Sequence, residues 1–298
     1  MNKNELGYFA SLVKEKVGWL ISGDDLFLIS AKVDNIIRKY GLDDTQALIK
    51  EIEKYPKSFL WTVIEELAPL TTWFYRDYKV VRDVDDVLFP FLQEQNYSTK
   101  KIKILSLGCS TGQEVYSVAM SIKKKIPDYK NWNIELLGVD LSSEAILKAQ
   151  KGSYSEFEIQ YGLNARDMIE NFKSDGDNWQ AKKELLKRVS FKRANIYKDN
   201  VSDEKYDLIF CCNVLNTFTP EAQKEVMEKI YEHQVMGGFL CLGVGERING
   251  LEEFYDSSNM ECVYKAKYSA GKKTSRVFSD TDMPTFERPE SLRMIKKM

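Results

Sequence analysis

The stretch Lys103-Ile104-Leu105-Ser106-Leu107-Gly108-Cys109-Ser110-Thr111-Gly112-Gln113-Glu114 decides the fold of this 298-residue chain. Its apolar first part predicts a buried strand, its small residues predict a tight turn, and the apolar spacing that follows predicts a helix from about Gln113 to Lys125. Glycines in the turn let the backbone approach a ligand closely, because a Cβ atom there would collide with it. Free N–H groups at the helix start are further donors. The stretch therefore predicts a ligand site.

A second apolar run, Ile134–Asp140, predicts a strand that ends in a carboxylate. An acid at such a strand end binds both ribose hydroxyls in nucleoside-binding α/β folds. The turn lacks the Gly-Lys-Ser/Thr of a Walker phosphate loop and has Gln113-Glu114 instead, which suits a cationic or amino-bearing ligand. S-adenosylmethionine, with a ribose, an ammonium group and a sulfonium but no phosphate, fits these requirements. The alternative is a tight turn that holds no ligand, and Asp140 disfavours it.

The composition is that of an ordinary globular protein, with 43% hydrophobic and 30% charged residues. A net charge of −2 disfavours a general nucleic-acid or anionic-membrane partner. Five cysteines without paired zinc-type spacing favour reduced thiols, and the only histidine, His233, disfavours a histidine-rich metal site or a histidine-based triad. No apolar run is long enough to span a bilayer. We therefore expect a cytoplasmic, metal-free protein that does not insert into the membrane.

The chain divides into two predicted domains and a tail. Apolar residues at helical spacing from about Leu6 to Leu67 predict an N-terminal all-α domain over residues 1–70. Strands that alternate with helices predict an α/β domain over residues 71–266, which a polar insertion at about residues 152–188 interrupts. Residues 267–298 are polar and basic with little periodicity, so we expect a mobile tail.

The second domain is predicted to contain a mostly parallel sheet with both faces covered. Further strands are predicted at Val189–Asn195, Tyr206–Asn213, Gly237–Gly243 and Met260–Ala266, with a helix from about Pro220 to His233. Ligands of such sheets bind beyond the carboxyl ends of the strands. Six polar residues stand at these ends, where the fold would bring them together: Ser110, Thr111, Glu114, Asp140, Asn195 and Asn213.

The segment Pro69-Leu70-Thr71-Thr72-Trp73-Phe74-Tyr75-Arg76-Asp77 has an unusual composition for a linker. Its consecutive aromatic residues can wall an adenine or a methyl-transfer pocket, and Arg76 can bind a carboxylate through two hydrogen bonds. In the alternative interpretation, the aromatic residues pack the helical domain against the next one and Arg76 pairs with Asp77. On this segment alone, the alternative is favoured.

Four motifs follow one another along the chain: Thr72–Asp77 (TWFYRD), Ser110–Ser117 (STGQEVYS), Gly152–Tyr154 (GSY) and Phe210–Leu215 (FCCNVL). In this order they resemble the chemotaxis-receptor methyltransferases of the CheR type, over nearly the whole chain. The resemblance implies an α/β fold with a Rossmann-like class I methyltransferase sheet of about seven mostly parallel strands, an N-terminal all-α domain and a small inserted subdomain. It also implies methyl transfer from S-adenosylmethionine, giving S-adenosylhomocysteine, to glutamate side chains on the cytoplasmic helices of chemoreceptors.

The resemblance also implies roles for residues at matching positions. Thr72 and Arg76 would hold the methionyl carboxylate of the cofactor, and Glu114 would face its amino group. Asp140 would bind the ribose, and Asn213 would lie near the reacting methyl. Arg76 and Asn213 are the implied catalytic residues. The other implied cofactor-binding residues are Gly108, Ser110, Thr111 and Cys212, together with Asn195 and Ile196, which would flank the adenine.

The chain departs from the family pattern on the acceptor side of the implied pocket. The family usually has Arg at the position of Cys212, Tyr at that of Thr217, and Gly-His-Ser-Glu where this chain has Gly243–Glu246. The segment Phe172–Arg188 is shorter than in family members that dock a receptor-tail peptide, which puts such tethering in doubt. An altered activity or acceptor is therefore compatible with the sequence.

Three functions remain open at this point. The leading hypothesis is a monomeric protein-glutamate O-methyltransferase that acts on chemoreceptors and binds no nucleic acid. The second is a relative that binds S-adenosylmethionine or S-adenosylhomocysteine as a signalling module without turnover, which the missing Tyr and Arg motivate. The third is a methyltransferase with a small-molecule or nucleic-acid acceptor; the acidic balance disfavours nucleic acid, and basic residues around the pocket mouth would favour it.

Overall fold

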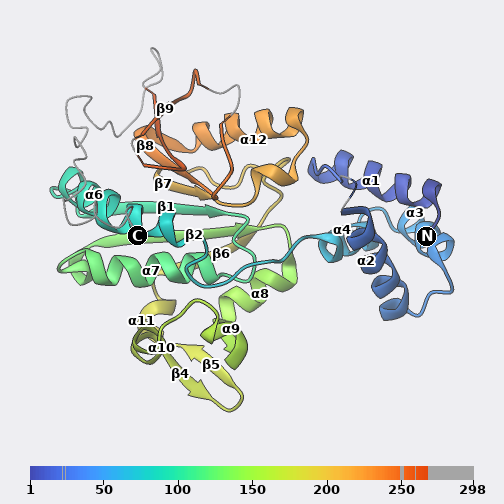
Figure 1. The fold of residues 1–298 in the computed structure, drawn as a ribbon, viewed down its shortest axis with the longest axis horizontal. Coiled ribbons are helices and arrows are strands. Elements are labelled where there is room, and N and C mark those ends of the chain that lie inside the picture. Colours follow the sequence, from blue (N-terminus) through green and yellow to red (C-terminus); the bar gives the residue numbers. More distant parts are fainter. Residues whose placement is uncertain (22, 24, 249–251, 259, 268–298) are drawn as a thin grey trace, which may run out of the picture.

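The computed structural model describes residues 1–21, 23, 25–248, 252–258 and 260–267 (Figure 1). The segment predicted as a tail, 267–298, lies outside these residues except for its first. Among the helices of the described residues, none is long and apolar enough to cross a membrane.

Four helices form the N-terminal domain, at the right of Figure 1: α1 (Lys3–Val17), α2 (Asp25–Tyr40), α3 (Thr45–Lys54) and α4 (Phe59–Leu67). Each helix buries apolar residues at helical spacing, and together these residues make a core of their own. The side-chain oxygens of Asn2 and Asp44 accept backbone N–H groups at the starts of α1 and α3. The helices agree with the pattern that predicts this domain.

A helical connection, for which no sequence pattern predicts an element, leads from this domain to the sheet. It consists of α5 (Tyr78–Asp83), the π-helix η1 (Val84–Leu88) and α6 (Phe89–Gln95). Val80, Val84, Leu88 and Phe89 are buried in the core of the α/β domain. The connection therefore packs as part of that domain.

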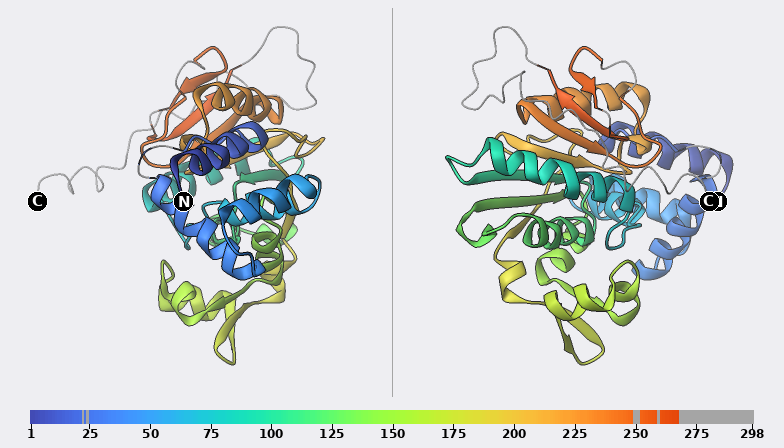
Figure 2. Two further views of the ribbon diagram at one scale, coloured as in Figure 1. Left: turned by 90° about the vertical axis from the view of Figure 1, so that its right-hand side faces the viewer. Right: turned by 60° about the vertical axis from the view of Figure 1, so that its left-hand side comes forward.

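The α/β domain contains a seven-stranded sheet in the order β6-β2-β1-β7-β8-β10-β9 (Figure 2). The five strands from β6 to β8 are parallel, whereas β10 and β9 are antiparallel to their neighbours. This confirms the predicted Rossmann-like, mostly parallel sheet. The strands are β1 (Lys101–Leu107), β2 (Asn133–Asp140), β6 (Val189–Arg193), β7 (Tyr206–Cys211), β8 (Gln234–Leu242), β9 (Tyr255–Ser257) and β10 (Val263–Ala266).

The helices that follow these strands are α7 (Gln113–Lys125), α8 (Ser143–Lys151) and α12 (Pro220–Glu232), with short 3₁₀ turns η2 (Tyr129–Asn131) and η3 (Leu215–Thr217). The predicted helix bounds agree closely with α7 and α12. The strand bounds differ more. The fifth parallel strand begins at Gln234 and not at Gly237, and β9 was not predicted. β6 ends at Arg193 and β7 at Cys211, so Asn195 and Asn213 stand in the loops that follow them.

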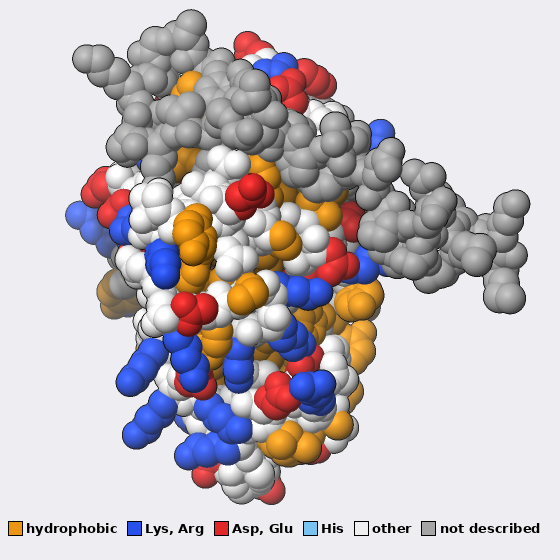
Figure 3. Space-filling model, turned by 90° about the vertical axis from the view of Figure 1, so that its left-hand side faces the viewer, with side chains coloured by type: hydrophobic (Ala, Val, Ile, Leu, Met, Phe, Trp, Pro, Cys, Tyr) orange, Lys and Arg blue, Asp and Glu red, His pale blue; other side chains and the backbone are white. Residues whose placement is uncertain are grey.

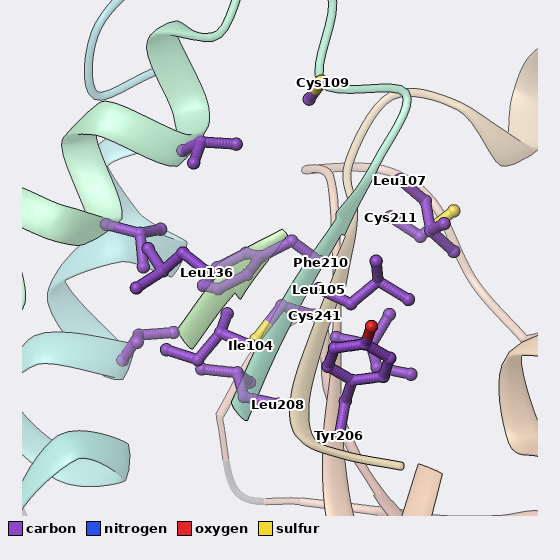
Figure 4. Packing of buried hydrophobic residues seen from close by; sticks show 14 of the residues in the cluster. Ile104, Leu105, Leu107, Cys109, Leu136, Tyr206, Leu208, Phe210, Cys211 and Cys241 are labelled. Carbon is purple, nitrogen blue, oxygen red and sulfur yellow. The ribbon is translucent and has the colours of Figure 1, made fainter. Parts of the chain in front are cut away.

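The core of the α/β domain lies around its central strands. Ile104 of β1 is in register with Leu136 of β2 and Leu208 of β7, so the three side chains share one face of the sheet. Figure 4 shows them packed together. Every residue of β7 is buried, as expected for a strand with neighbours on both sides and cover on both faces.

A small subdomain is inserted between α8 and β6, at the bottom of Figure 1. It has its own antiparallel sheet in the order β3-β5-β4. Its elements are β3 (Ser153–Ser155), α9 (Glu156–Gln160), α10 (Ala165–Asn171), β4 (Phe172–Asp175), β5 (Asn178–Ala181) and α11 (Lys183–Leu186).

Candidate functional site

A cavity, whose open space including its mouth is ≈ 870 Å³, lies beyond the carboxyl ends of β1, β2, β6 and β7, where the helical domain meets the sheet. This is where ligands bind in parallel sheets of this kind. All but one of the predicted cofactor-binding residues line it: Thr72, Arg76, Gly108, Ser110, Glu114, Asp140, Asn195, Ile196, Cys212 and Asn213.

Thr111 is the exception, because it is not among the residues that line the cavity. Its hydroxyl donates to Gln113 Oε1 at 2.8 Å, and its carbonyl oxygen accepts the Tyr154 hydroxyl at 2.8 Å. Thr111 therefore ties the turn to α7 and to the inserted subdomain. The role in cofactor binding that the resemblance implied for Thr111 stays a prediction.

The glycines of the first turn allow close packing against protein atoms. Gly108 has φ +68°, and a Cβ there would lie 2.4 Å from Val214 Cγ2. Gly112 has φ +94°, and its Cβ would lie 2.8 Å from Ala149 Cβ. These distances give the glycines a packing role, and the close approach of a ligand to the turn stays a prediction. Glycine is required because the neighbouring segments approach and φ is positive.

Asp140 sits at the end of β2 and is 8% exposed. Its Oδ2 accepts the Ser110 N–H at 2.8 Å, and its Oδ1 accepts the Ser142 N–H at 2.9 Å. Burial raises the pKa of Asp140, while these backbone hydrogen bonds lower it. A carboxylate has about four acceptor sites, so lone pairs remain for hydroxyl groups in the cavity.

Glu114 stands in the first turn of α7 and also lines the cavity. Ser106 Oγ donates to its Oε1 at 2.7 Å. Burial is the largest influence and raises the pKa of Glu114 to about 7, and hydrogen bonds from Ser106 and Cys212 lower it less. A cationic group next to Glu114 would favour the ionised form. The Glu114 carboxylate is thus an acceptor that fits an ammonium ligand.

Arg76 lies over the ring of Trp73, with its Cζ 4.6 Å from the ring centroid, and its Nη1 donates to the Thr71 carbonyl at 2.6 Å. It is not paired with Asp77, whose Oδ2 accepts instead from Asn213 Nδ2 at 2.6 Å. The alternative pairing of Arg76 with Asp77 is therefore wrong. Arg76 remains in the cavity wall with donors available.

The aromatic residues of the same segment pack against the inserted subdomain. The fully buried Phe74 meets Tyr154 and Phe172 edge-on, at centroid distances of 5.1 and 5.5 Å. The Tyr75 N–H donates to Ser117 Oγ at 2.9 Å. The aromatic residues do act as packing, as the alternative proposed, but these contacts are to the insertion and to α7 and not to the helical domain.

Asn213 is held in the left-handed region, with φ +61°, by a buried acid that the sequence analysis missed. Glu246 is 2% exposed, and its Oε2 accepts the N–H groups of Asn213 at 2.6 Å and of Gly243 at 2.9 Å. Its Oε1 accepts the Asn216 N–H at 3.1 Å. Glu246 therefore joins the loops after β7 and β8. One feature of the sequence could have identified Glu246. The family pattern Gly-His-Ser-Glu and the segment Gly243–Glu246 of this chain both end in Glu.

The helical domain contributes cavity walls that no sequence pattern indicated. Val17 and Trp19 line the cavity together with residues of the sheet domain. Trp19 forms an isolated β-bridge with Phe218. Asn195 Nδ2 donates to the carbonyl of Lys16 at 2.9 Å, so this side chain fastens α1 to the sheet. The cavity is thus formed by both domains.

No cluster of three or more His, Cys, Asp or Glu side chains is placed to hold a metal ion within the described part of the chain. The five cysteines are unpaired thiols, four of them buried. Cys212 is the half-buried one, and burial raises its pKa well above the ordinary value, so it stands next to Glu114 as a neutral thiol.

Comparisons with known proteins agree with this geometry. Residues 70–264 match the family described as CheR methyltransferase, SAM binding domain. The chemotaxis protein methyltransferase Cher2 of Pseudomonas putida is 25% identical over 272 residues, which is 87% of this chain and 96% of that relative. The chemotaxis protein methyltransferase of Borreliella burgdorferi is 27% identical over 277 residues, 90% of this chain and 94% of the relative.

Among solved structures, CalS10 of Micromonospora echinaspora, an amino pentose methyltransferase bound to S-adenosylmethionine, aligns with 54% of this chain and 48% of its own, at 14% identity and a TM-score of 0.34. The assignment rests on the sequence match, which covers well over half of the chain and all the strands of the main sheet except the final residues of β10. The chain belongs to the CheR methyltransferase family.

Proposed function

We propose that this protein transfers the methyl group of S-adenosylmethionine to glutamate carboxylates on the cytoplasmic helices of chemoreceptors. The observation that carries the proposal is the meeting of Arg76, Glu114, Asp140 and Asn213 in one cavity, although they come from four separate segments of the chain. The relatives' printed names support the chemoreceptor as acceptor.

The residues of the cavity fit the parts of this cofactor, which supplies a methyl group already activated by a positive sulfur. Asp140 would accept the ribose hydroxyls with the lone pairs that Ser110 and Ser142 leave free. Glu114 would accept the ammonium group, and Arg76 would donate to the methionyl carboxylate. These contacts fix the cofactor at both ends, so that its position relative to an acceptor is set by the protein.

The acceptor makes modest demands on the protein. A glutamate carboxylate is ionised near pH 7, so no general base is needed. The protein has to align the nucleophile with the methyl group and exclude water. Asn213, held by Asp77 and Glu246, would provide a fixed wall at the reacting end. This accounts for a transferase in which the only histidine, His233, does not line the cavity.

A nucleic-acid acceptor gains no support from the charge distribution. Among the residues that line the cavity, Arg76 is the only Lys or Arg. Lys and Arg side chains gather instead over the lower part of the face in Figure 3, which points away from the helical domain. That side of the molecule carries the end of α7, with its Lys123, Lys124 and Lys125.

The test is methyl transfer from tritium-labelled S-adenosylmethionine to chemoreceptor cytoplasmic fragments. We expect label on the receptor that base releases as volatile methanol, the behaviour of a carboxyl methyl ester. The matched control is the Asp140→Ala protein, which should transfer little. Binding of S-adenosylhomocysteine without any transfer would contradict the proposal and favour a signalling module, in line with the Cys212 and Thr217 departures.

A further inference from the structure

A chain of aromatic contacts runs from the cavity wall to the inserted subdomain. The Arg76 guanidinium lies 4.6 Å from the centroid of Trp73. Trp73 in turn meets Tyr161 at 5.4 Å with an interplanar angle of 65°. Tyr161, just after α9, stacks on Phe157 at 6.0 Å and 8°. Arg76 and Tyr161 are 85 positions apart in the sequence, yet a single ring separates them.

Trp73 depends on these two neighbours because it lies outside both hydrophobic cores. Phe74 is part of the large core and Tyr75 packs against it, whereas neither core cluster of the described residues includes Trp73. Trp73 is half-buried, and its ring contacts are with the Arg76 guanidinium and the Tyr161 ring. The orientation of a ring outside the cores is set by such contacts. The edge contact with Tyr161 is therefore what fixes the platform beneath Arg76.

Tyr161 is itself held firmly against the segment that carries Trp73. Its N–H donates to the Phe157 carbonyl at 3.1 Å. The next residue, Gly162, has φ +107°, and a Cβ there would lie 1.9 Å from the carbonyl oxygen of Phe74. The turn after α9 thus packs against the backbone next to Trp73 and sets the position from which the Tyr161 side chain extends. The ring itself is 52% exposed, and its ring contacts are with Trp73 and Phe157.

We propose that Tyr161 is a positioning residue that holds Trp73 in place and thereby holds the Arg76 guanidinium at the cavity wall. The inference rests on the proposed function, because it takes Arg76 to bind the carboxylate end of the cofactor. A guanidinium stacked on a fixed ring is preorganised, and so it loses less freedom when it binds a carboxylate. The inserted subdomain thus contributes to cofactor affinity without touching the cofactor.

The experiment is calorimetric titration of S-adenosylhomocysteine into the full-length protein and its variants. We expect Tyr161→Ala to raise Kd by about threefold to tenfold, the range of a partly exposed cation–π contact. Tyr161→Phe should restore the affinity to within about twofold, because the ring makes the contact. Phe157→Ala is the matched control and should leave Kd within about twofold, because Phe157 is 78% exposed and its ring contact is with Tyr161 and not with Trp73.

A double-mutant cycle separates positioning from a general structural role. In the Arg76→Ala background, Tyr161→Ala should cause no further loss of affinity. Trp73→Leu should reproduce the Tyr161→Ala loss and serves as a second variant. An unchanged Kd in Tyr161→Ala, or a loss of equal size with and without Arg76, would overturn the inference. A wild-type protein that fails to bind S-adenosylhomocysteine would instead overturn the proposed function as well.

Discussion

Glu114 and Asp140 are both acids of the cavity wall, but they differ in their hydrogen-bond partners and therefore in the role that we expect of each. Asp140 accepts backbone N–H groups on both oxygens, which stabilise its ionised form and fix its orientation. Glu114 has a hydroxyl and a thiol as its hydrogen-bond partners, and burial raises its pKa to about 7. Asp140 is thus a fixed acceptor, whereas the charge of Glu114 responds to a ligand.

Asp140→Ala should weaken the binding of S-adenosylhomocysteine by roughly 1–3 kcal/mol, because charge-assisted bonds to the ribose are lost. Titration calorimetry measures the change. Thr111→Val is a suitable control, since Thr111 lies next to the same turn but does not line the cavity. Equal affinities of the Asp140→Ala and wild-type proteins would rule out the ribose role.

The affinity for S-adenosylhomocysteine should depend on pH through Glu114. Its pKa of about 7 in the free protein means that it must lose a proton to receive the ligand's ammonium group. The Kd should therefore fall by roughly fivefold to tenfold between pH 6 and pH 7.5, as the ionised fraction of a group with this pKa rises. Glu114→Gln should bind weakly at both pH values. A wild-type Kd that does not change with pH would contradict this role.

At the scale of elements, the loops after β7 and β8 act as one unit because Glu246 accepts N–H groups from both. Close packing reinforces the pair, since a Cβ on Gly243 would lie 2.7 Å from the Asn213 nitrogen. The same loops carry Cys212 and Thr217, the two departures from the family pattern. Cys212 and Thr217 therefore lie in loops whose backbone is fixed by hydrogen bonds to Glu246.

Glu246→Ala should lower the free energy of unfolding by about 2–4 kcal/mol, because three backbone N–H groups, in one buried and two partly buried hydrogen bonds, lose their acceptor. Glu246→Gln, which keeps one carbonyl oxygen in place, should cost less than Glu246→Ala. Urea unfolding measures both. If the alanine variant were as stable as the wild type, Glu246 would not be the link between the two loops.

The sequence predicts elements better than it predicts how their ends are arranged. The periodicity of Gln113–Lys125 and the apolar run Tyr206–Cys211 were sufficient to predict α7 and β7, because these patterns are local. The orientation of a turn depends on φ values and distant neighbours. The sequence therefore does not reveal that the Thr111 carbonyl accepts the Tyr154 hydroxyl, or that a Cβ on Gly108 would meet Val214.

At the scale of the whole molecule, the helical domain is fastened to the sheet by polar contacts. Glu65 of α4 accepts Arg193 Nη2 at 2.7 Å and the Ser143 N–H at 2.7 Å. The Leu20 N–H donates to the Thr217 carbonyl at 2.8 Å. Contacts between segments so far apart in the chain do not change the local hydrophobic periodicity. The sequence therefore does not predict that Val17 and Trp19 line the cavity.

Glu65→Ala should lower the free energy of unfolding by about 1–2 kcal/mol, because Arg193 and Ser143 lose a largely buried partner. Glu66→Ala is the matched control: its partner, Lys39, is half exposed and lies within the same domain, so we expect a change below about 1 kcal/mol. Urea unfolding of the full chain gives both values. Equal effects of the two substitutions would show that Glu65 does not join the domains.

Because Val17 and Trp19 close the cavity from the side of the helical domain, a nucleoside held there would touch both halves of the protein. Its occupancy and the association of the two halves are then linked equilibria. The linkage is reciprocal. A partner that pulled α1 away from the sheet would weaken cofactor binding, and bound cofactor would weaken the binding of that partner by the same factor. The affinity for the ligand therefore depends on the interface between the two domains, and a change at that interface would change the affinity.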